Sequence, residues 1–413
     1  MKETGKTMRH CLFAGVLALG LTGLCGEAPP EVAHRPTTFA ADVLRPHVER
    51  GELPGAISVF HKDGAEETCC IGFADVAAGR AITLDDPFMQ CSQTKGFCGV
   101  TVAMLVEEGK VALDDPVSKY LPEFGELWVQ EPETNGVRML RRARNVLTVR
   151  MCLNHTGGLP FELANYEAMG GWSRRMPLRS VAATAAAQPL RFEPGTKVQY
   201  SNVGIDIAAA VVEKVTGRRW ESFLQERLLG PLGMTSTGFW PSEADQARKI
   251  EMYQVAAGRK AEWKAENPLM ARPYGDDRVF PSAGAGLWTT ARDQLRFYKM
   301  LMNLGVGENG VRVLKAETVK DLLARSSRPK GMGGYSLGLS VTEVGPDDVW
   351  FGHGGAWDTG CWVNWRRKEL KMWVVQTNGD PRPWVKEHAQ AADRFFEHVT
   401  DHAAEDAYRG RLE

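Results

Sequence analysis

The chain has 413 residues, of which 43 % are hydrophobic and 24 % are charged, so it can fill the core of one large domain or two modest ones. Its 50 Lys and Arg residues and 51 Asp and Glu residues leave a formal net charge of −1. Because no basic stretch combines with aromatic residues, this composition gives no electrostatic support for nucleic-acid binding.

The first residues have the pattern of a secretory signal. Positively charged residues precede an apolar run over 11–24, and small residues follow it. The run is shorter than the ~20 residues that a membrane span needs. We therefore expect a signal peptide over 1–27 and a Pro-rich, polar linker over 28–37.

This leader predicts export to the periplasm or the extracellular space. Two alternatives stay open: lipid attachment at Cys25, and an N-terminal anchor helix. Either of them would associate the protein with a membrane through its N-terminus. The sequence does not indicate an oligomeric state.

The eight cysteines do not form a disulfide pattern, although export would permit disulfides. Cys69 and Cys70 are adjacent, and Cys91 and Cys98 lie seven apart on an expected helix. That spacing separates the latter pair by about 10 Å along a helix axis, beyond the ~7 Å between Cα atoms that a disulfide bridges. Most cysteines are therefore expected to be buried thiols.

The first third of the chain predicts a helix, a hairpin and a second helix. The opening helix covers 40–49, with Pro46 as a candidate kink. The hairpin is expected around a turn at 62–64, and the second helix over 92–108, capped by Gly109.

The middle of the chain predicts helices separated by long loops. Two polar or Gly-rich loops are expected, over 123–145 and 157–175. Helices are expected over 148–153, 205–216 and 290–304.

The last part of the chain returns to strands and ends in a helix. Two strands are expected over 362–365 and 371–377, joined by a polar connection, with a closing helix over 383–399 and a polar tail over 401–413. Strands at both ends, with helices between them, predict a sheet built from the two chain ends and a helical lobe inserted in the middle.

Ser92-Gln-Thr-Lys95 is the strongest candidate for nucleophilic chemistry. A serine hydroxyl is a weak nucleophile that needs a base beside it. Positions i and i+3 share one face of a helix, so the amine of Lys95 can reach the hydroxyl of Ser92. A lysine serves as a base only if its pKa is lowered, and burial does that.

The alternative, non-catalytic interpretation of this pattern is a serine that caps the helix N-terminus, followed by a solvated lysine. A second copy of the pattern, Ser327-Arg-Pro-Lys330, provides an internal control. Because Pro329 interrupts it and a Gly-rich run follows, we expect that copy to be a surface loop.

Two later patterns supply further polar groups. Tyr200-Ser-Asn202 lies just before an expected helix, where a phenol and an amide can point at one place. His353-Gly-Gly355 precedes an expected strand, and its glycines allow close approach of a ligand. Each pattern alone could also be a capping amide or a turn histidine. A similar sequence at His155 is expected to be structural.

Several aromatic residues have two open interpretations. Tyr335, Trp357, Trp362 and a loop over 161–172 either border a substrate pocket or belong to the packed core.

Taken together and in this order, the three patterns resemble the serine β-lactamase and penicillin-binding-protein superfamily, and specifically its class C β-lactamase-related branch of esterases and D-amino-acid peptidases. The resemblance covers roughly residues 38–400. It implies a β-lactamase/transpeptidase-like fold of the mixed α/β (α+β) class, with an antiparallel sheet flanked by helices. The α/β lobe would cover about 38–90 and 275–400, and the helical lobe about 91–274.

The resemblance also implies roles for the matched residues. Ser92 would attack an ester or amide carbonyl, while Lys95 and Tyr200 would share the acid–base work. Asn202 would orient Lys95 and the substrate. The other implied contacts are an oxyanion hole from the backbone N–H groups of Ser92 and Ala356, and a far wall formed by His353 and Gly355. No metal or cofactor is implied, and the expected partner is a small-molecule or peptide substrate.

One departure from the family pattern bears on the substrate. Class C β-lactamases carry Lys-Thr-Gly where this chain has His353-Gly354-Gly355. Histidine, with a reference pKa near 6.5, is mostly neutral at pH 7, so a β-lactam carboxylate loses a cationic partner. We therefore expect weak or absent β-lactamase activity and hydrolysis of esters or amides. A penicillin-binding sensor with slow turnover and a true β-lactamase remain as alternatives.

Overall fold

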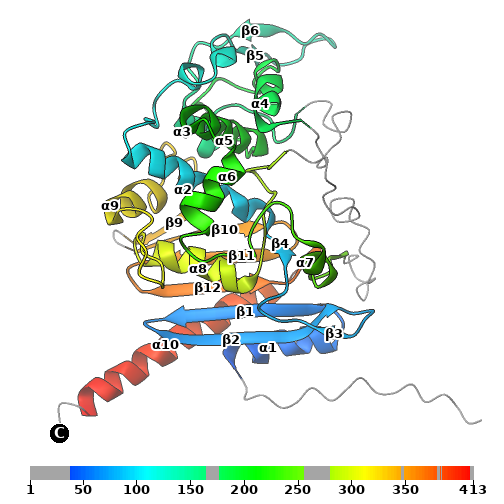
Figure 1. Cartoon of the computed structure of the whole chain (residues 1–413), viewed down its shortest axis with the longest axis vertical. Helices are drawn as coiled ribbons and strands as arrows, with labels where there is room; N and C mark the ends of the chain where they lie inside the picture. The colour runs from blue at the N-terminus through cyan, green and yellow to red at the C-terminus, as the bar shows by residue number, and fades with distance from the viewer. Residues whose placement is uncertain are drawn as a thin grey trace, which may run out of the picture. The chain divides into compact units, whose positions relative to one another are not determined.

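A large antiparallel sheet joins the two ends of the chain. The computed structural model describes residues 38–163, 176–254, 280–345, 348–378, 382 and 384–409. The sheet has seven strands in the order β3-β2-β1-β12-β11-β10-β9. Their bounds are Gly55–Lys62 (β1), Ala65–Asp75 (β2), Arg80–Ala81 (β3), Ser340–Gly345 (β9), Asp348–Gly355 (β10), Thr359–Asn364 (β11) and Glu369–Val374 (β12). The expected sheet from both chain ends is confirmed, because β1 pairs directly with β12 (Figure 1).

The first hairpin forms at the predicted turn. Asp63 and Gly64 have φ angles of 47° and 90°, and Lys62 pairs with Ala65 across them. A two-residue connection with both residues in the left-handed region matches the right-handed twist of the flanking strands, which is why an Asp-Gly pair occurs here. The strand β1 is buried almost throughout because its alternate side chains enter two core clusters: Ile57 and Val59 on one face, and Ala56 and Phe60 on the face that carries α1 and α10.

Two helices from opposite ends of the chain cover one face of the sheet. These are α1 (Phe39–Glu49) and α10 (Trp384–Arg409), which pack on each other and on β1 and β2 (Figure 1). The side chain of Thr38 caps α1 by accepting from Ala41 N. The closing helix runs ten residues past its expected end at 399, into the segment expected to be a polar tail, since residues 400–409 contain no Gly or Pro to stop it.

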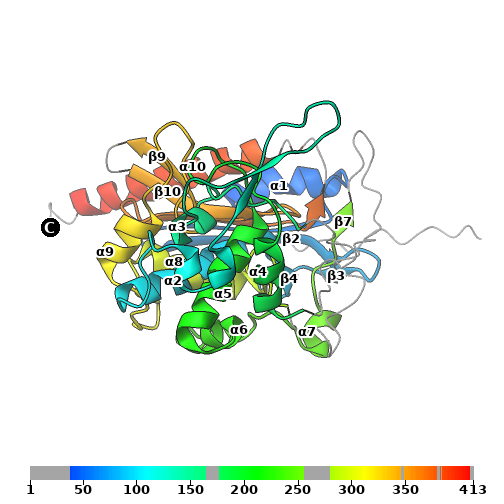
Figure 2. The same cartoon turned by 90° about the horizontal axis from the view of Figure 1, so that it is seen from above.

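The opposite face carries α8 (Ala291–Met302) and the helical lobe. α8 lies on β11 and β12, and the rings of Phe97 and Phe297 stack at 3.8 Å between α2 (Thr94–Glu107) and α8. Viewed from above, α2, α3 and α5 lie over the strands (Figure 2). α2 is buried over nearly its whole length because α5 packs on it from the lobe side.

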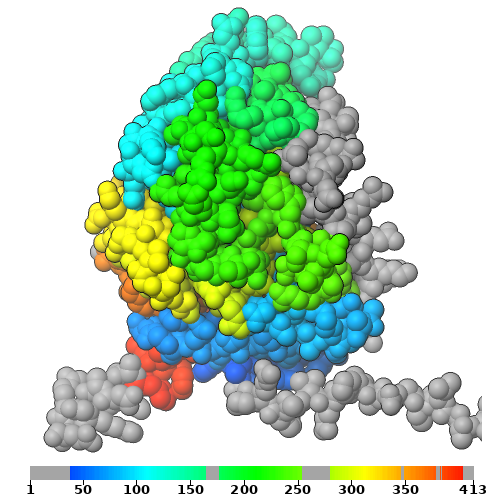
Figure 3. All heavy atoms as spheres, in the orientation of Figure 1, coloured from blue at the N-terminus to red at the C-terminus, as the bar shows by residue number. Residues whose placement is uncertain are grey.

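The helical lobe is built mainly from short helices. Its elements include α3 (Val149–Leu153), α4 (Leu178–Ala186), α5 (Asn202–Thr216), α6 (Trp220–Leu224), η6 (Gln225–Leu229) and α7 (Glu243–Ala247), with α9 (Ala316–Thr318) and η7 (Val319–Leu323) following α8. Single-turn helices occur at Cys91–Gln93 (η1), Val117–Lys119 (η2) and Pro122–Phe124 (η3). The space-filling view shows the lobe seated on the sheet layer (Figure 3).

Three small two-stranded sheets complete the described elements. They pair β4 (Phe88–Met89) with β8 (Trp288–Thr289), β5 (Trp128–Gln130) with β6 (Leu140–Arg142), and β7 (Tyr253–Gln254) with β13 (Thr377–Asn378). The segment 123–145, expected to be mostly polar loop, thus contains the β5–β6 hairpin. Its strands are three residues long and largely exposed, too short for an alternating pattern to stand out.

The described cysteines are free thiols, as expected from their spacing. All of these except Cys70 are buried, including Cys91 and Cys98 beside the predicted serine. No described helix is both long and apolar enough to cross a bilayer. The predicted leader and linker, and most of the loop over 157–175, lie outside the described residues.

Candidate active site

Ser92 lies at the sharp entry to the central helix α2. It belongs to the single turn η1, and α2 proper begins two residues later, at Thr94. The preceding residue, Cys91, has a φ of 50°, a left-handed conformation that is strained for a side chain other than Gly. This turn sets Ser92, which is half-buried, at the N-terminal end of α2, where the helix field favours negative charge.

Lys95 lies fully buried one helical turn after Ser92. Its Nζ is 3.1 Å from Ser92 Oγ, 2.7 Å from Asn202 Oδ1 and 2.6 Å from the carbonyl oxygen of Gly284. A neutral amine has two N–H groups and one lone pair. If the two shorter contacts use the N–H groups, the lone pair is left to accept the proton of Ser92.

The environment of Lys95 makes the neutral amine accessible near pH 7. Burial lowers its pKa to about 7, although the negative charges of Asp206 and Glu162 oppose this shift. The ammonium form is also held 4.5 Å from the centroid of the Tyr200 ring, a favourable cation–π distance. Lys95 can therefore gain or lose a proton without a large free-energy cost at neutral pH.

Tyr200 and Asn202 come from the start of α5. The side chain of Ser201 caps this helix by accepting from Gly204 N at 2.9 Å and donates to Pro160 O at 2.7 Å. Asn202 accepts from Lys95 at Oδ1 and donates from Nδ2 to Glu162 Oε1 at 2.7 Å, so both ends of its amide are fixed.

The Tyr200 hydroxyl faces the predicted nucleophile. Burial raises the pKa of the phenol well above its usual range, while hydrogen bonds with Ser92 and Tyr335 partly oppose this shift. Tyr200 therefore carries its proton at neutral pH and is suited to donate it.

Asp206 supports the site from one turn further along α5 and was missed by the sequence reasoning. Its Oδ1 accepts from the backbone N–H groups of Ala283 at 2.8 Å and Gly284 at 3.3 Å. This contact fixes the loop whose Gly284 carbonyl accepts from Lys95. The sequence did contain a signal for this role. Asp206 is a lone carboxylate four residues after Asn202, on a helix that is otherwise apolar in this stretch.

His353 lies on β10 and is a neutral acceptor in this structure. Its Nδ1–H donates to the carbonyl of Gly354, which leaves Nε2 to accept from the Tyr335 hydroxyl at 2.6 Å. Burial, together with the nearby charge of Lys95, lowers its pKa to about 3. Nε2 of His353 also lies 3.5 Å from the Tyr200 hydroxyl, but its shorter contact is the one to Tyr335. From the sequence, Tyr335 could be either a pocket residue or a core residue.

His155, expected to be structural, packs directly against the same tyrosines. It has a φ of 67°, and its Nδ1 accepts from Ser201 N at 3.2 Å. Its ring centroid lies 4.5 Å from that of Tyr200 and 4.6 Å from that of Tyr335. His155 thus helps to hold Tyr200 in place at the start of α5.

Strand β10 ends at Gly355, close to the turn that holds Ser92, and Ala356 follows it. A Cβ on Gly355 would lie 2.3 Å from the carbonyl oxygen of Gln90, so only glycine allows this approach. The exposed Ala356 opens the loop to β11, directly after the strand β10 that contacts the turn η1 holding Ser92. Asp358, in the same loop, accepts from Arg382 and from Thr377 Oγ1 at 3.0 Å, which ties the loop down.

The remaining candidates separate into groups. Tyr335 is buried against His353, and Trp357 packs in a small cluster that includes Cys91. Trp362 lies elsewhere, on the face of the sheet that carries α10. The second Ser-x-x-Lys copy is irregular with an exposed Lys330, as expected of a surface loop. Within the described residues, no group of His, Cys, Asp and Glu side chains is arranged to hold a metal ion.

Comparison with known proteins agrees with the resemblance. The family described as Beta-lactamase matches residues 40–395. Protein Rv1367c of Mycobacterium tuberculosis is 31 % identical over 332 residues, which cover 76 % of this chain and 81 % of that protein. Esterase EstB of Burkholderia gladioli is 30 % identical over 292 residues, covering 63 % of this chain and 71 % of EstB.

A solved structure supports the fold independently. It is described as EstCE1, a hydrolase with promiscuous acyltransferase activity, and it aligns with a TM-score of 0.70 at 21 % identity. The alignment covers 86 % of this chain and 97 % of that one. The extent of the family match and the fold together show that this chain belongs to the beta-lactamase family.

Proposed function

We propose that this chain hydrolyses uncharged esters through an acyl-enzyme on Ser92. Its family places it among the serine hydrolases in general terms. The observation that carries the finer proposal is the buried amine of Lys95, 3.1 Å from Ser92 Oγ, with its pKa lowered to about 7.

The protonation states of Lys95 and Tyr200 at neutral pH assign them different roles beside Ser92. Neutral Lys95 takes the proton of Ser92 as the serine oxygen bonds to the substrate carbonyl carbon. The resulting oxyanion would accept hydrogen bonds from the backbone N–H groups of Ser92 and Ala356. Tyr200, which is protonated at neutral pH, gives its proton to the departing alkoxide and recovers one from the Lys95 ammonium. A water molecule then repeats these steps in the second half-reaction to release the acid.

The neutral charge state of His353 supports esters over β-lactams as substrates. The side chain that takes the place of the family's lysine is neutral, and its Nε2 already accepts from Tyr335. A substrate carboxylate beside His353 would therefore be desolvated without a cationic partner from that residue, which is costly. The relative named Esterase EstB is consistent with this preference.

Intact-mass analysis after incubation with a fluorophosphonate tests the nucleophile. We expect one adduct on the wild-type chain and none on Ser92→Ala. The matched control is Ser327→Ala, which removes the serine of the second Ser-x-x-Lys copy and should label fully. An adduct of undiminished yield on Ser92→Ala would reject Ser92 as the nucleophile.

Steady-state rates test the substrate class. The wild-type chain should hydrolyse a short-chain aryl ester with continuous turnover, much faster than a chromogenic cephalosporin. A comparable rate on the cephalosporin would contradict the ester assignment. One equivalent of product followed by a plateau would replace the hydrolase with a slowly deacylating sensor.

A further inference from the structure

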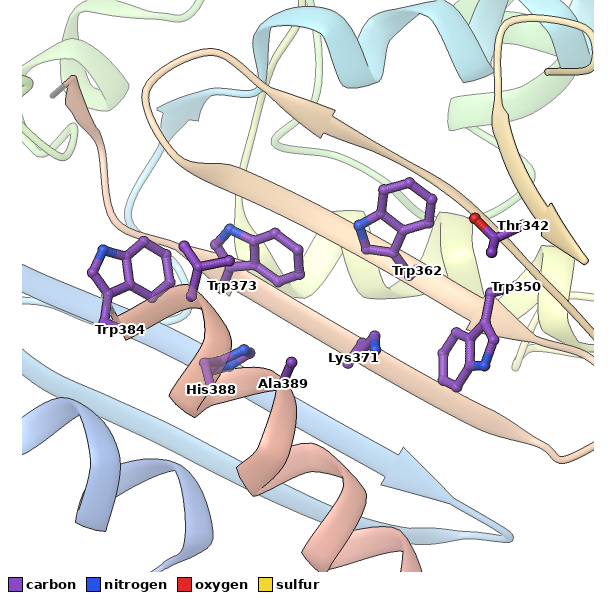
Figure 4. A pocket seen from close by; sticks show the side chains of 9 residues that line it. Thr342, Trp350, Trp362, Lys371, Trp373, Trp384, His388 and Ala389 are labelled. Carbon is purple, nitrogen blue, oxygen red and sulfur yellow. The ribbon is translucent and has the colours of Figure 1, made fainter. Parts of the chain in front are cut away.

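A cavity lined by tryptophans lies on the face of the sheet away from Ser92. It measures about 320 Å³, within the range of small-molecule sites. None of the residues assigned to the candidate active site contributes to it. Its lining comes from β9–β12 and the first turns of α10: Thr342, Trp350, Trp362, Lys371, Trp373, Trp384, Val385, His388 and Ala389 (Figure 4).

Strand alternation explains why the rings gather there. Phe351, Cys361 and Met372 point into the core under the helical lobe, so their neighbours Trp350, Trp362 and Trp373 point to the other face. On that face α1 and α10 pack mainly over β1 and β2. The side chains of Trp350, Trp362 and Trp373 consequently remain only half-buried. A strand face that is not fully covered ordinarily carries polar residues instead.

Two rings of the lining, those of Trp373 and His388, are held in place by their neighbours. Trp373 pairs with Gly360 across the strands, and its ring occupies the space of a Gly360 side chain, since a Cβ there would lie 2.3 Å from Trp373 Cζ2. His388, at the wall formed by α10, bonds through Nε2 to Ser58 Oγ at 2.8 Å, and burial lowers its pKa to about 3. The cavity is therefore a largely preformed apolar slot with a neutral histidine in its wall.

Lys371 is the one charged side chain in the lining. Its Nζ lies 4.6 Å from the centroid of the Trp350 ring, and Figure 4 shows it in the middle of the group of tryptophans. Burial lowers the pKa of Lys371, with partial opposition from Asp393 and Glu369. Among the described residues, no carboxylate lies within ion-pairing distance of it. The ammonium thus has an aromatic face as a partner and lacks a direct counter-ion.

These features select one class of ligand. Flat tryptophan faces favour a planar apolar ring, which gains both buried area and stacking. An anionic group beside Lys371 would supply the missing counter-ion in a partly desolvated place. A cationic ligand is disfavoured, since Lys371 already occupies the cation position over Trp350.

We propose that this cavity is a second ligand site, separate from Ser92, which takes a small planar aromatic carboxylate. The ring lies among Trp350, Trp362 and Trp373, and the carboxylate pairs with the ammonium of Lys371. This proposal does not depend on the hydrolase assignment, since it involves no reaction and none of the candidate active-site residues.

Calorimetric titration with three probes that share one ring tests the proposal: naphthalene-2-carboxylate, naphthalene-2-carboxamide and naphthalen-2-ylmethylammonium. On the full-length chain we expect saturable binding, with affinity decreasing from the carboxylate to the amide to the ammonium. Lys371→Met keeps the length and apolar character of the side chain. It should weaken carboxylate binding about tenfold while changing amide binding by less than about twofold.

Tryptophan variants provide the second arm of this binding experiment. Trp362→Ala and the milder Trp362→Phe should weaken carboxylate and amide together, the former by about tenfold or more. The matched control is Trp128→Ala, because Trp128 is an exposed tryptophan outside the cavity and likewise has a cation beside its ring, with Arg142 5.0 Å from the centroid. Thermal unfolding checks that each variant is folded. No saturation by any probe, tighter binding of the ammonium, an unchanged preference in Lys371→Met, or an equal loss in Trp128→Ala would each overturn the proposal.

Discussion

The buried amine of Lys95 predicts a specific pH profile for ester hydrolysis. Its pKa is lowered to about 7, and only the neutral amine can accept the proton of Ser92. The neutral fraction is then about one half at pH 7, about one tenth at pH 6 and about one hundredth at pH 5. We expect kcat/KM to fall about tenfold per pH unit below pH 6 or so, and to level off above about pH 8.

The assay is the initial rate on a fluorogenic butyrate ester at constant ionic strength, from about pH 5 to about pH 9, with Ser92→Ala as the blank. His353, with a pKa lowered to about 3, stays neutral throughout this window and adds no inflection. Tyr200, with a raised pKa, stays protonated. A flat profile over the window, or activity that rises as pH falls, would refute the assignment of Lys95 as the base.

A charge-removing variant tests the cause of that inflection. The carboxylate of Asp206 stabilises the Lys95 ammonium and is the largest influence that raises its pKa against the effect of burial. In Asp206→Asn the ammonium loses its proton more readily, so the acidic limb should move to lower pH. Glu162→Gln should move it in the same direction by less, since Glu162 has a smaller effect. A shift to higher pH in either variant would contradict this account.

Three further substitutions test the site. Ser92→Ala should lower kcat by about 10⁶-fold while Ser327→Ala leaves it unchanged, measured on the same ester. Tyr335→Phe removes the donor to His353 Nε2 and should cost about 1–3 kcal/mol of unfolding free energy in urea titrations; an unchanged midpoint would argue against that bond. Gly355→Ala places a Cβ against Gln90 O and should cost about 1–3 kcal/mol and most of the activity, whereas Gly238→Ala, with open space around it, should cost little; equal effects would discount the close approach.

Some parts of the site follow from local geometry and could be predicted from sequence. The i, i+3 spacing of Ser92 and Lys95 brings the amine to the hydroxyl within one helical turn, and the start of α5 presents Asn202 to Lys95 two residues after Tyr200. The hairpin at Asp63 and Gly64 follows from backbone preference alone. Helix caps at Thr38, Thr148 and Thr290 likewise mark starts that sequence reasoning placed within a few residues.

Other parts depend on contacts between distant segments and left no local signal. The carbonyl of Gly284 is a ligand of Lys95 only because Asp206 holds its loop in place. Tyr335 meets His353 through the folding of β9 against β10, which no periodicity in either segment specifies. Alternation along β10–β12 separates the two faces, but it does not reveal that α10 only partly covers the tryptophan face and leaves a cavity beside its first turns.

The charge states of Lys95 and His353 have one cause, and together they bear on the substrate. Exclusion of water lowers both pKa values, which gives a base usable at neutral pH and a histidine without charge. In the proposed mechanism, the same exclusion would strengthen hydrogen bonds to the developing oxyanion and would penalise a carboxylate that lacks a cationic partner. A permanently charged lysine at position 353 would offer such a partner, but its charge would also lower the pKa of Lys95 further. An uncharged ester avoids this conflict, since it requires negative charge only where the backbone N–H groups can receive it.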